Sequence, residues 1–309
     1  MAGFFARLNA RRVVRQGLGG AARGKGLRLH KCLKTTGGTV VYAGELDHKP
    51  VVIKRALGPS AADLAGAQAR ELAYQHPRMG DGPYRVPEPI LSNPEVGLVV
   101  MGQAPGQRLD HALRDAPERR RELIAASARW LAHYIAPRRE VDTFGGGYWI
   151  KRRLAAIEHM PASADRRRIE TLIGIMRREK ALISGRPITR ARSHGDFCAI
   201  NLMVDGDDIW GVDIQNSHWL AVAKDIARFL VYLEIALPAG HYNGPCGLSL
   251  ADCHAFLGER DLISADEANR VLPYFVASEV AGRLISEQTH AYMMSAAQAL
   301  ADRLIEERG

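Results

Sequence analysis

Residues 193–213 read SHGDFCAINLMVDGDDIWGVD, and this stretch decides which fold the chain adopts. Two short apolar runs lie on either side of the acidic, glycine-containing cluster Asp205–Asp208. The runs are Asn201–Val204 and Ile209–Ile214. Apolar runs separated by turn-forming residues are typical of a β-hairpin. The sequence therefore predicts a hairpin that turns at Asp205–Asp208.

The predicted hairpin brings polar side chains together. Its register, with Val204 opposite Ile209, predicts that Asn201 and Asp213 converge at the open end, close to the loop that precedes the hairpin. That loop carries Asp196. Carboxylate and amide oxygens are the ligands that Mg²⁺ prefers when it also carries phosphates. We therefore expect a functional site here, with Asn201 and Asp213 as metal ligands.

The order of these residues resembles the catalytic core of the aminoglycoside phosphotransferase/choline kinase-like family, a small-molecule branch of the protein-kinase fold. The order is His194-Gly195-Asp196, then Asn201, then Asp213 after the hairpin, then Asp225-Ile226-Ala227 where the family usually has Asp-Leu-Ala. The resemblance covers residues 27–300. It implies an α+β fold of the bilobal protein-kinase-like type, with a small antiparallel-sheet N-terminal lobe and a mostly helical C-terminal lobe.

The resemblance also implies an activity: ATP- and Mg²⁺-dependent transfer of a phosphoryl group to a hydroxyl of a small molecule. Such transfer needs positioning and charge neutralisation more than covalent chemistry. Asp196 is expected to accept or orient the proton of the acceptor hydroxyl, and Asn201 and Asp213 to hold the Mg²⁺. Asp225 is expected to be a structural anchor that caps the next helix and ties down the catalytic loop.

A helix is predicted after the strand that ends at Lys54. It opens at a Ser60–Asp63 capping box and stops before Pro77. Helical spacing places four residues on its inward stripe, namely Leu64, Ala67, Glu71 and Tyr74. A carboxylate on an inward stripe is costly unless it is paired with a cation.

Lys54 and Glu71 explain each other as a partly buried ion pair. The resemblance implies that Lys54 binds the α- and β-phosphates of the nucleotide and that Glu71 fixes Lys54 in place. Gly37-Gly38 lies in the turn between the first two of three predicted antiparallel strands within residues 27–54. Backbone N–H groups can approach phosphates at such a turn, although a plain hairpin turn explains the two glycines equally well.

Composition sets apart a basic arm, and the resemblance implies two lobes after it. Residues 1–26 are a basic arm, and no acidic residue occurs before Glu45. Residues 27–102 are predicted to form the nucleotide-binding lobe. Residues 103–309 are predicted to form the helical lobe with the catalytic loop and the acceptor site. A basic arm can bind an anionic membrane surface, but a solvated helix explains the same composition.

The partners are expected to be small molecules. The chain has a net charge of +8, but its internal arginine runs suit solvated helix ends, so no nucleic-acid partner is expected. Acidic residues are frequent after residue 250 and would suit a cationic acceptor such as an amino sugar or amino alcohol, although solvated helix faces explain them equally well. Four scattered cysteines and no bilayer-length apolar run favour a cytoplasmic location.

The chain departs from the family pattern at two places. Phe197–Ile200 stands where the family often has a His-Pro-Gly-like insert, and Ile214-Gln215 stands where it commonly has an aromatic residue and a glutamate. An unusual acceptor-side surface is therefore expected. Two alternatives stay open: a kinase that acts on a membrane glycolipid sugar or a protein side chain, and a catalytically inactive nucleotide-binding module.

Overall fold

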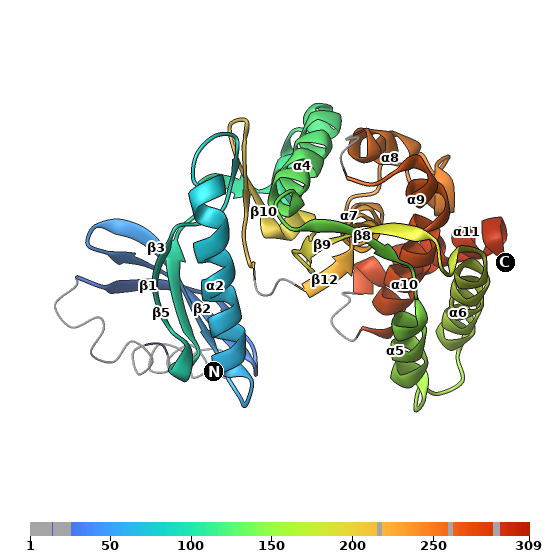
Figure 1. Ribbon diagram of the computed structural model, residues 1–309, viewed down its shortest axis with the longest axis horizontal. Helices are drawn as coiled ribbons and strands as arrows, with labels where there is room; N and C mark the ends of the chain where they lie inside the picture. The colour runs from blue at the N-terminus through green and yellow to red at the C-terminus, as the bar shows by residue number, and fades with distance from the viewer. Residues whose placement is uncertain (1–13, 15–25, 215–217, 259–261, 287–290) are drawn as a thin grey trace. The chain divides into compact units, whose positions relative to one another are not determined.

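The structure is a computed structural model that describes Val14 and residues 26–214, 218–258, 262–286 and 291–309. It consists of two compact units, one rich in strands and the other rich in helices (Figure 1). The first unit comprises residues 1–107 and 203–217, and the second comprises residues 108–202 and 218–309. The predicted hairpin therefore belongs to the N-terminal unit, although it follows the catalytic loop in the sequence. Apart from Val14 and Gly26, the basic arm lies outside the described residues.

A five-stranded antiparallel sheet forms the body of the first unit, in the order β1-β2-β3-β6-β5. Its strands are β1 (Arg28–Thr35), β2 (Thr39–Leu46), β3 (Lys49–Ala56), β5 (Pro89–Asn93) and β6 (Leu98–Gly102). The three predicted strands are confirmed. The turn between β2 and β3 contains only Asp47 and His48, whose φ angles of 48° and 64° are left-handed. Two such residues form the type I′ turn that suits a tight hairpin.

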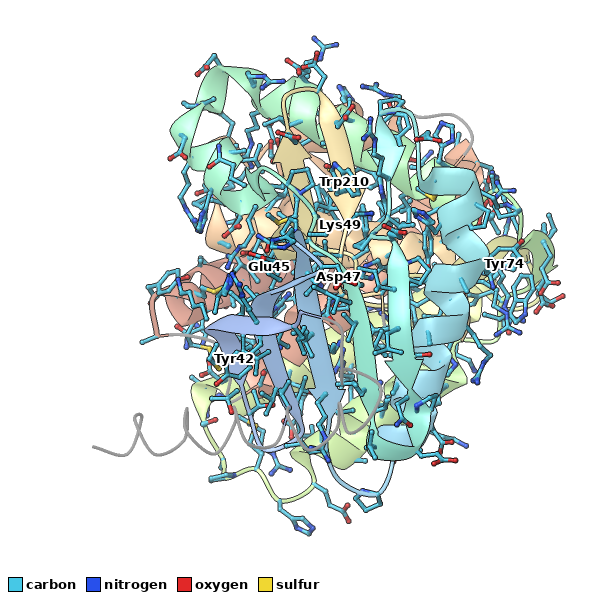
Figure 2. The ribbon with its side chains drawn as sticks, turned by 90° about the vertical axis from the view of Figure 1, so that its left-hand side faces the viewer. Tyr42, Glu45, Asp47, Lys49, Tyr74 and Trp210 are labelled. Carbon is cyan, nitrogen blue, oxygen red and sulfur yellow. The ribbon has the colours of Figure 1, made fainter. Side chains whose placement is uncertain are left out.

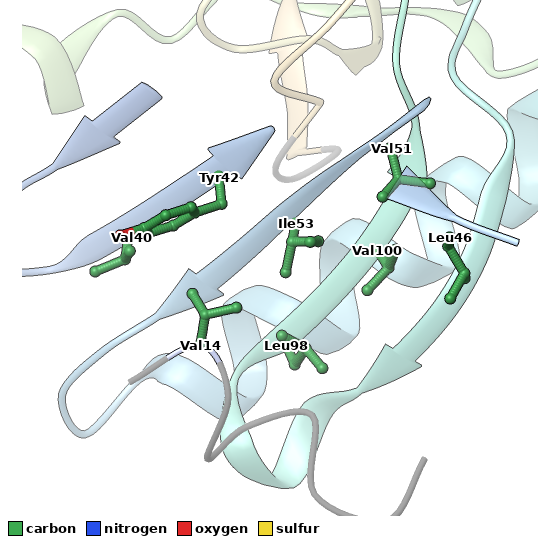
Figure 3. Close-up of a cluster of buried hydrophobic side chains, with 8 residues drawn as sticks. All are labelled: Val14, Val40, Tyr42, Leu46, Val51, Ile53, Leu98 and Val100. Atoms are coloured by element: carbon green, nitrogen blue, oxygen red, sulfur yellow. The ribbon is translucent and has the colours of Figure 1, made fainter. Parts of the chain in front are cut away.

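The two faces of this sheet differ because side chains alternate along each strand. One face carries an apolar cluster, which Figure 3 shows. Its members are Val14, Val40, Tyr42, Leu46, Val51, Ile53, Leu98 and Val100. Lys54 and Val99, each next in sequence to a member of this cluster, point to the opposite face. Helix α2 (Ala61–Met79) contributes side chains beside them.

Helix α2 is longer than the sequence predicts. The Ser60 side chain makes no capping hydrogen bond, and the helix continues through Pro77 to Met79. Met79 is 2% exposed, and its carbonyl oxygen accepts a hydrogen bond of 2.9 Å from the N–H of Val86. Burial and this bond hold the last turn in place despite the proline.

The buried stripe of α2 is rotated from the predicted one. Glu71 is buried as expected, but Leu64 and Tyr74 are 39% and 40% exposed, and Figure 2 shows Tyr74 on the outer side of the helix. The buried residues are Ala65, Gly66, Gln68, Glu71, Leu72, Gln75 and Met79. Two glutamines therefore occupy inward positions that the pattern assigns to apolar residues.

The hairpin forms as predicted, from β10 (Leu202–Asp205) and β11 (Asp208–Gly211). It is the centre of a four-stranded sheet in the order β4-β11-β10-β7, in which β4 (Tyr84–Arg85) runs parallel to β11 and β7 spans Gln107–Arg108. Gly106 lies so close to β10 that a Cβ atom there would be 1.9 Å from the carbonyl oxygen of Val204.

The second unit is mostly helical, with α10 packed against α5, α6, α7 and α11. Its helices are α3 (Leu109–Asp115), α4 (Arg120–Ile135), α5 (Gly147–Ile157), α6 (Ala164–Ile183), α7 (Val222–Ala236), α8 (Leu250–Leu257), α9 (Ala265–Arg270), α10 (Leu272–Ile285) and α11 (Ala291–Arg308). It also contains a three-stranded antiparallel sheet that the sequence did not predict: β8 (Arg139–Thr143), β9 (Pro187–Ser193) and β12 (His218–Ala221). Within the described residues, no helix has both the length and the apolar content that crossing a bilayer requires.

Candidate active site

In the first unit, Lys54 of β3 forms an ion pair with Asp213, which follows strand β11. The two residues are 159 positions apart in the sequence. Their side chains are 12% and 27% exposed, so the contact is largely shielded from solvent. Asp213 has a left-handed φ of 57°, which aspartate adopts more readily than most residues. The fold therefore turns this carboxylate onto Lys54.

The structure pairs Lys54 with Asp213 rather than with the predicted partner, Glu71. Glu71 is 3% exposed, and its Oε1 accepts a hydrogen bond of 3.1 Å from Nε2 of Gln75, one turn further along α2. The rotated helix stripe is the physical reason, because it places Gln68 beside Lys54.

A small pocket between the sheet and α2 contains the Lys54 side chain. Its lining consists of Thr39, Lys54, Ala56, Leu64, Ala65, Gln68, Gly97 and Val99. Nε2 of Gln68 is buried and has no hydrogen-bond partner among the residues that the structure describes. The pocket thus has an ammonium and an amide N–H as donors, and donors of this kind suit the phosphate oxygens of a nucleotide.

The turn with Gly37 and Gly38 connects β1 to β2. The carbonyl oxygen of Gly38 accepts a hydrogen bond of 2.9 Å from the N–H of Leu57, just past β3. A Cβ atom at either glycine would meet nothing within 4 Å, and neither glycine has a left-handed φ. The fold of the chain itself therefore does not require glycine here, and the space over the turn is open.

In the second unit, the catalytic loop runs from β9 to the short 3₁₀ helix η4 (Ala199–Asn201). Gly195 has a left-handed φ of 79°, which makes the bend before Asp196. Nδ2 of Asn201 donates a hydrogen bond of 2.9 Å to the backbone carbonyl of Asp196. This bond leaves the amide oxygen of Asn201 as the side-chain group that could bind a cation.

Aromatic packing holds this loop from beneath. Phe197 is fully buried and stacks between Trp130 and Phe229, with ring centroids 5.8 Å and 5.2 Å away. His194 is 3% exposed, and its ring lies edge-on to Trp130 at 6.0 Å. The unusual stretch after Asp196 is therefore mostly core, because only Ile200 of its four residues is exposed.

Arg228 of α7 holds the Asp196 side chain by an ion pair. Nε of Arg228 donates to Oδ1 of Asp196 at 2.6 Å, and Nη1 donates to Oε2 of Glu279 on α10 at 3.2 Å. Burial would lower the pKa of Arg228, but the two carboxylates outweigh it and raise that pKa above its ordinary value. The Asp196 side chain is nevertheless 40% exposed, so an acceptor can reach it.

Asp225 anchors the loop, as predicted. It is fully buried, and its Oδ2 accepts a hydrogen bond of 3.5 Å from the N–H of Gly195. Burial raises its pKa. Asp225 does not cap the helix, however, because the N-cap residue of α7 is Ala221 and makes no side-chain cap bond.

Sequence reasoning missed Arg228 and Glu279. Lys224, Asp225 and Arg228 lie within five residues on α7, and Arg228 is a surface neighbour of both others because it lies four and three positions after them. Charges on an otherwise apolar helix indicated that this face meets other charges. The position of Glu279, 51 residues later, depends on how α10 packs.

The predicted Mg²⁺ ligands come from different units, Asn201 from the second and Asp213 from the first. Within the described residues, no group of three or more histidine, cysteine, aspartate or glutamate side chains could hold a metal ion. One carboxylate and one amide oxygen, completed by phosphate oxygens, still match the donor chemistry of Mg²⁺. The side chains of Asn201 and Asp213 each fit Mg²⁺ by donor type, and their joint role as metal ligands stays a prediction.

Comparison with known proteins identifies the family. No curated protein sequence matches the chain. The model of the phosphotransferase enzyme family matches residues 36–244, which is more than half of the chain.

Among solved structures, a choline/ethanolamine kinase family protein from Mesorhizobium loti is 14% identical, with a TM-score of 0.63 over 96% of this chain and 97% of the other. A thermostable mutant of aminoglycoside phosphotransferase APH(4)-Ia, in complex with AMP-PNP and hygromycin B, is 12% identical (TM-score 0.61; 92% and 94% covered). Glucosamine kinase is 16% identical (TM-score 0.58; 92% and 82% covered). These likenesses confirm the predicted kinase-like fold, and the chain belongs to the phosphotransferase enzyme family.

Proposed function

We propose that this phosphotransferase transfers the γ-phosphoryl group of ATP to a hydroxyl group of a small molecule, in a reaction that depends on Mg²⁺. The observation that carries the proposal is the ion pair between Lys54 and Asp213. It unites the predicted phosphate-binding lysine with the predicted metal-binding aspartate inside one unit. A buried ion pair of this kind adds little to stability on its own, so a role in ligand binding explains it better.

The nucleotide side of the proposal uses residues of the first unit. Lys54 binds the α- and β-phosphates, and the backbone N–H groups of Gly37 and Gly38 approach the phosphates through the open space over their turn. Asp213, which pairs with Lys54 in this structure, would hold the Mg²⁺ through its carboxylate. Glu71, the buried carboxylate of α2, then becomes the counter-charge for Lys54.

The metal and acceptor side of the proposal uses the catalytic loop. Asn201 supplies its amide oxygen to the metal, and bound Mg²⁺ neutralises negative charge on the phosphate oxygens. Asp196 accepts the proton of the acceptor hydroxyl as the new P–O bond forms and the bond between the γ-phosphorus and the bridging oxygen breaks, so that ADP leaves. Arg228 orients the Asp196 carboxylate, since its guanidinium holds that carboxylate from α7.

Amino sugars and amino alcohols are the first acceptors to test. The structures described as a choline/ethanolamine kinase family protein and as glucosamine kinase support this choice through the shared fold. We also propose a cytoplasmic location, which the four free cysteines support because such thiols persist in a reducing compartment. Membrane contact through the basic arm remains a proposal from the sequence alone.

The test replaces Asp196 with alanine. We expect Asp196→Ala to abolish acceptor-dependent ATP consumption, measured in a coupled assay over a panel of hydroxylated small molecules, while ATP still binds in isothermal titration. Asp142→Ala is a matched control, because Asp142 is also 40% exposed and is also held by an arginine, Arg190. Full activity in Asp196→Ala would refute the assignment, and loss of activity in both variants would show a non-specific effect.

A further inference from the structure

Four cationic side chains of the second unit surround one buried carboxylate. Glu279 is 5% exposed; Nη1 of Arg228 lies 3.2 Å and Nζ of Lys224 lies 3.8 Å from its oxygens. The charges of two further arginines, from α5 and α10, also act on it. We call this set the cationic cluster: Arg153, Lys224, Arg228 and Arg283.

Positive charge exceeds negative charge in the cationic cluster. Arg228 also pairs with Asp196, and buried Asp225, which accepts a hydrogen bond from the Gly195 N–H, acts on Lys224. Among these named groups, the four cations therefore face three carboxylates, those of Glu279, Asp196 and Asp225. Burial lowers the pKa of Arg153, and the nearby charges of Arg152 and Arg228 lower it further, as expected where guanidinium groups crowd together. A cluster of this kind is stabilised by an additional anion.

Arg153 has unused hydrogen-bonding capacity for such an anion. Its Nε is buried without a hydrogen-bond partner among the described residues. Its guanidinium lies against Gly282 of α10, where a Cβ atom would be 2.6 Å from Nη2. The glycine therefore makes space for this guanidinium. Trp149, one turn earlier on α5, has its ring centroid 5.1 Å from Nζ of Lys224 and adds an apolar wall.

The cluster is accessible at the end that includes the predicted catalytic residue. The Arg228 and Asp196 side chains are 26% and 40% exposed. An acceptor whose hydroxyl reaches Asp196 would therefore present its neighbouring groups to cations rather than to free carboxylates.

The acidic residues of α8, α9 and α10 are already engaged with other groups of the protein. Asp252 pairs with Arg120, and Asp266 pairs with Arg270. Glu267 completes the capping box of α9. Together with Glu279, these are all the carboxylates of α8, α9 and α10. Each of them already has a partner in the protein, so these three helices offer no free carboxylate to a cationic acceptor.

We infer that the acceptor carries an oxyanion group, a carboxylate or a phosphate, in addition to its hydroxyl, and that the cationic cluster binds this group beside Asp196. Arginine suits the task, since its planar fork of N–H donors matches the oxygens of carboxylate and phosphate. The inference rests on the proposed function, because it concerns the acceptor of that same reaction. It favours hydroxy acids and sugar acids over simple amino alcohols.

Binding tests the inference without turnover. Full-length protein with ADP and Mg²⁺ is titrated calorimetrically with D-glucuronate, D-glucose and D-glucosamine, which share one ring, and with sulfate as the minimal oxyanion. We expect sulfate or glucuronate to bind, and Arg153→Gln to weaken that binding about tenfold or more. Arg270→Gln, which removes an exposed arginine of the same unit, leaves it unchanged. Thermal unfolding verifies that both variants are folded, and Arg153→Lys should restore part of the affinity.

Three results would overturn the inference: neither anion binds, glucosamine binds better than glucuronate, or the two glutamine variants weaken anion binding equally. Acceptor-dependent ATP consumption is measured separately on the same compounds. Phosphorylation of cationic acceptors without anion binding would remove the oxyanion subsite and keep the proposed function. Anion binding that depends on Arg153, without ATP consumption on any acceptor, would keep the subsite and remove the phosphotransferase.

Discussion

Glu279→Gln tests whether the buried carboxylate neutralises the cations around it. The substitution keeps the shape of the side chain and one oxygen acceptor but removes the negative charge. Lys224, whose side chain is only 7% exposed, then loses the carboxylate 3.8 Å away, and Arg228 keeps only Asp196. Leaving a buried charge without its partner is among the most destabilising changes in a protein.

The expected loss of stability follows from this geometry. Removing one partner of a buried ion pair costs about 3–5 kcal/mol, and the retained amide oxygen and the second partner of Arg228 bring our expectation to about 2–3 kcal/mol. For a unit of this size, the midpoint of thermal unfolding falls by about 2–4 °C per kcal/mol, which gives about 4–12 °C. Glu122→Gln is the matched control, because Glu122 also pairs with an arginine but is 55% exposed. Its loss should stay below about 1 kcal/mol.

The pH dependence supplies a second readout. Burial would raise the pKa of Glu279, but the surrounding cations outweigh it, and the pKa lies below the ordinary value of 4.5. A carboxyl with a lowered pKa stabilises the folded state fully above its unfolded value and loses this contribution as the pH falls through the folded value. The gap between wild type and Glu279→Gln, measured by urea unfolding, should therefore be constant near neutral pH and shrink below about pH 4.5. Equal losses in the Glu279 and Glu122 variants, or a gap that does not change with pH, would refute the reasoning.

Two further predictions concern packing and thiol reactivity. Gly106→Ala places a Cβ atom 1.9 Å from the Val204 carbonyl at a left-handed φ of 76°, so we expect a loss of about 2–4 kcal/mol in urea unfolding. Gly145→Ala, where a Cβ atom meets nothing within 4 Å, should cost less than about 1 kcal/mol. Burial raises the pKa of Cys198, Cys246 and Cys253 to about 12, so iodoacetamide at pH 8 should label Cys32 first, as mass spectrometry of the native protein will reveal. Rapid labelling of Cys198 would contradict its burial.

Local sequence patterns predicted the parts of the fold that local rules govern. The strands β1, β2 and β3 and the two strands of the hairpin, β10 and β11, contain apolar residues and are separated by turn residues. A serine followed three residues later by a glutamate is the sequence signature of a capping box, and Ser264 and Glu267 form one at the start of α9, with both of its reciprocal hydrogen bonds. In each case the residues that determine the structure lie within a few positions of one another.

The sheet of the second unit could not be predicted in the same way. Strand β9 reads PITRARS, and its buried side chains include Thr189 and Ser193 beside Ile188 and Ala191. A strand with two arginines and small polar inward residues resembles a loop in composition. It forms because β8 and β12 pair with its two edges and because Glu267 accepts hydrogen bonds from Thr189 across 78 residues.

The partner of Lys54 was missed for a related reason. Periodicity in α2 fixes which residues share a face, but a rotation of one position changes which of them meets the sheet. A glutamine is unfavourable on a helix face that packs only against apolar side chains. Gln68 is tolerated on the inward face because it lines the same pocket as the charged Lys54. Asp213 reaches Lys54 only because the hairpin before it, although distant from Lys54 in sequence, is part of the first unit.

The difference between local patterns and contacts that are distant in sequence also matters for predicting the acceptor. Asp196, Asn201 and Asp213 follow one another along a single stretch, and their spacing by itself indicates the type of chemistry. The cationic cluster, by contrast, draws one side chain from α5, two from α7 and one from α10, so only the packing of three helices assembles it. Residues that perform a shared reaction are constrained to a motif, whereas residues that select the acceptor need only face the same space. If the cluster binds an oxyanion, then the acidic composition of the C-terminal sequence indicated the wrong charge for the acceptor, because Asp252, Asp266 and Glu279 pair with arginines of the protein itself.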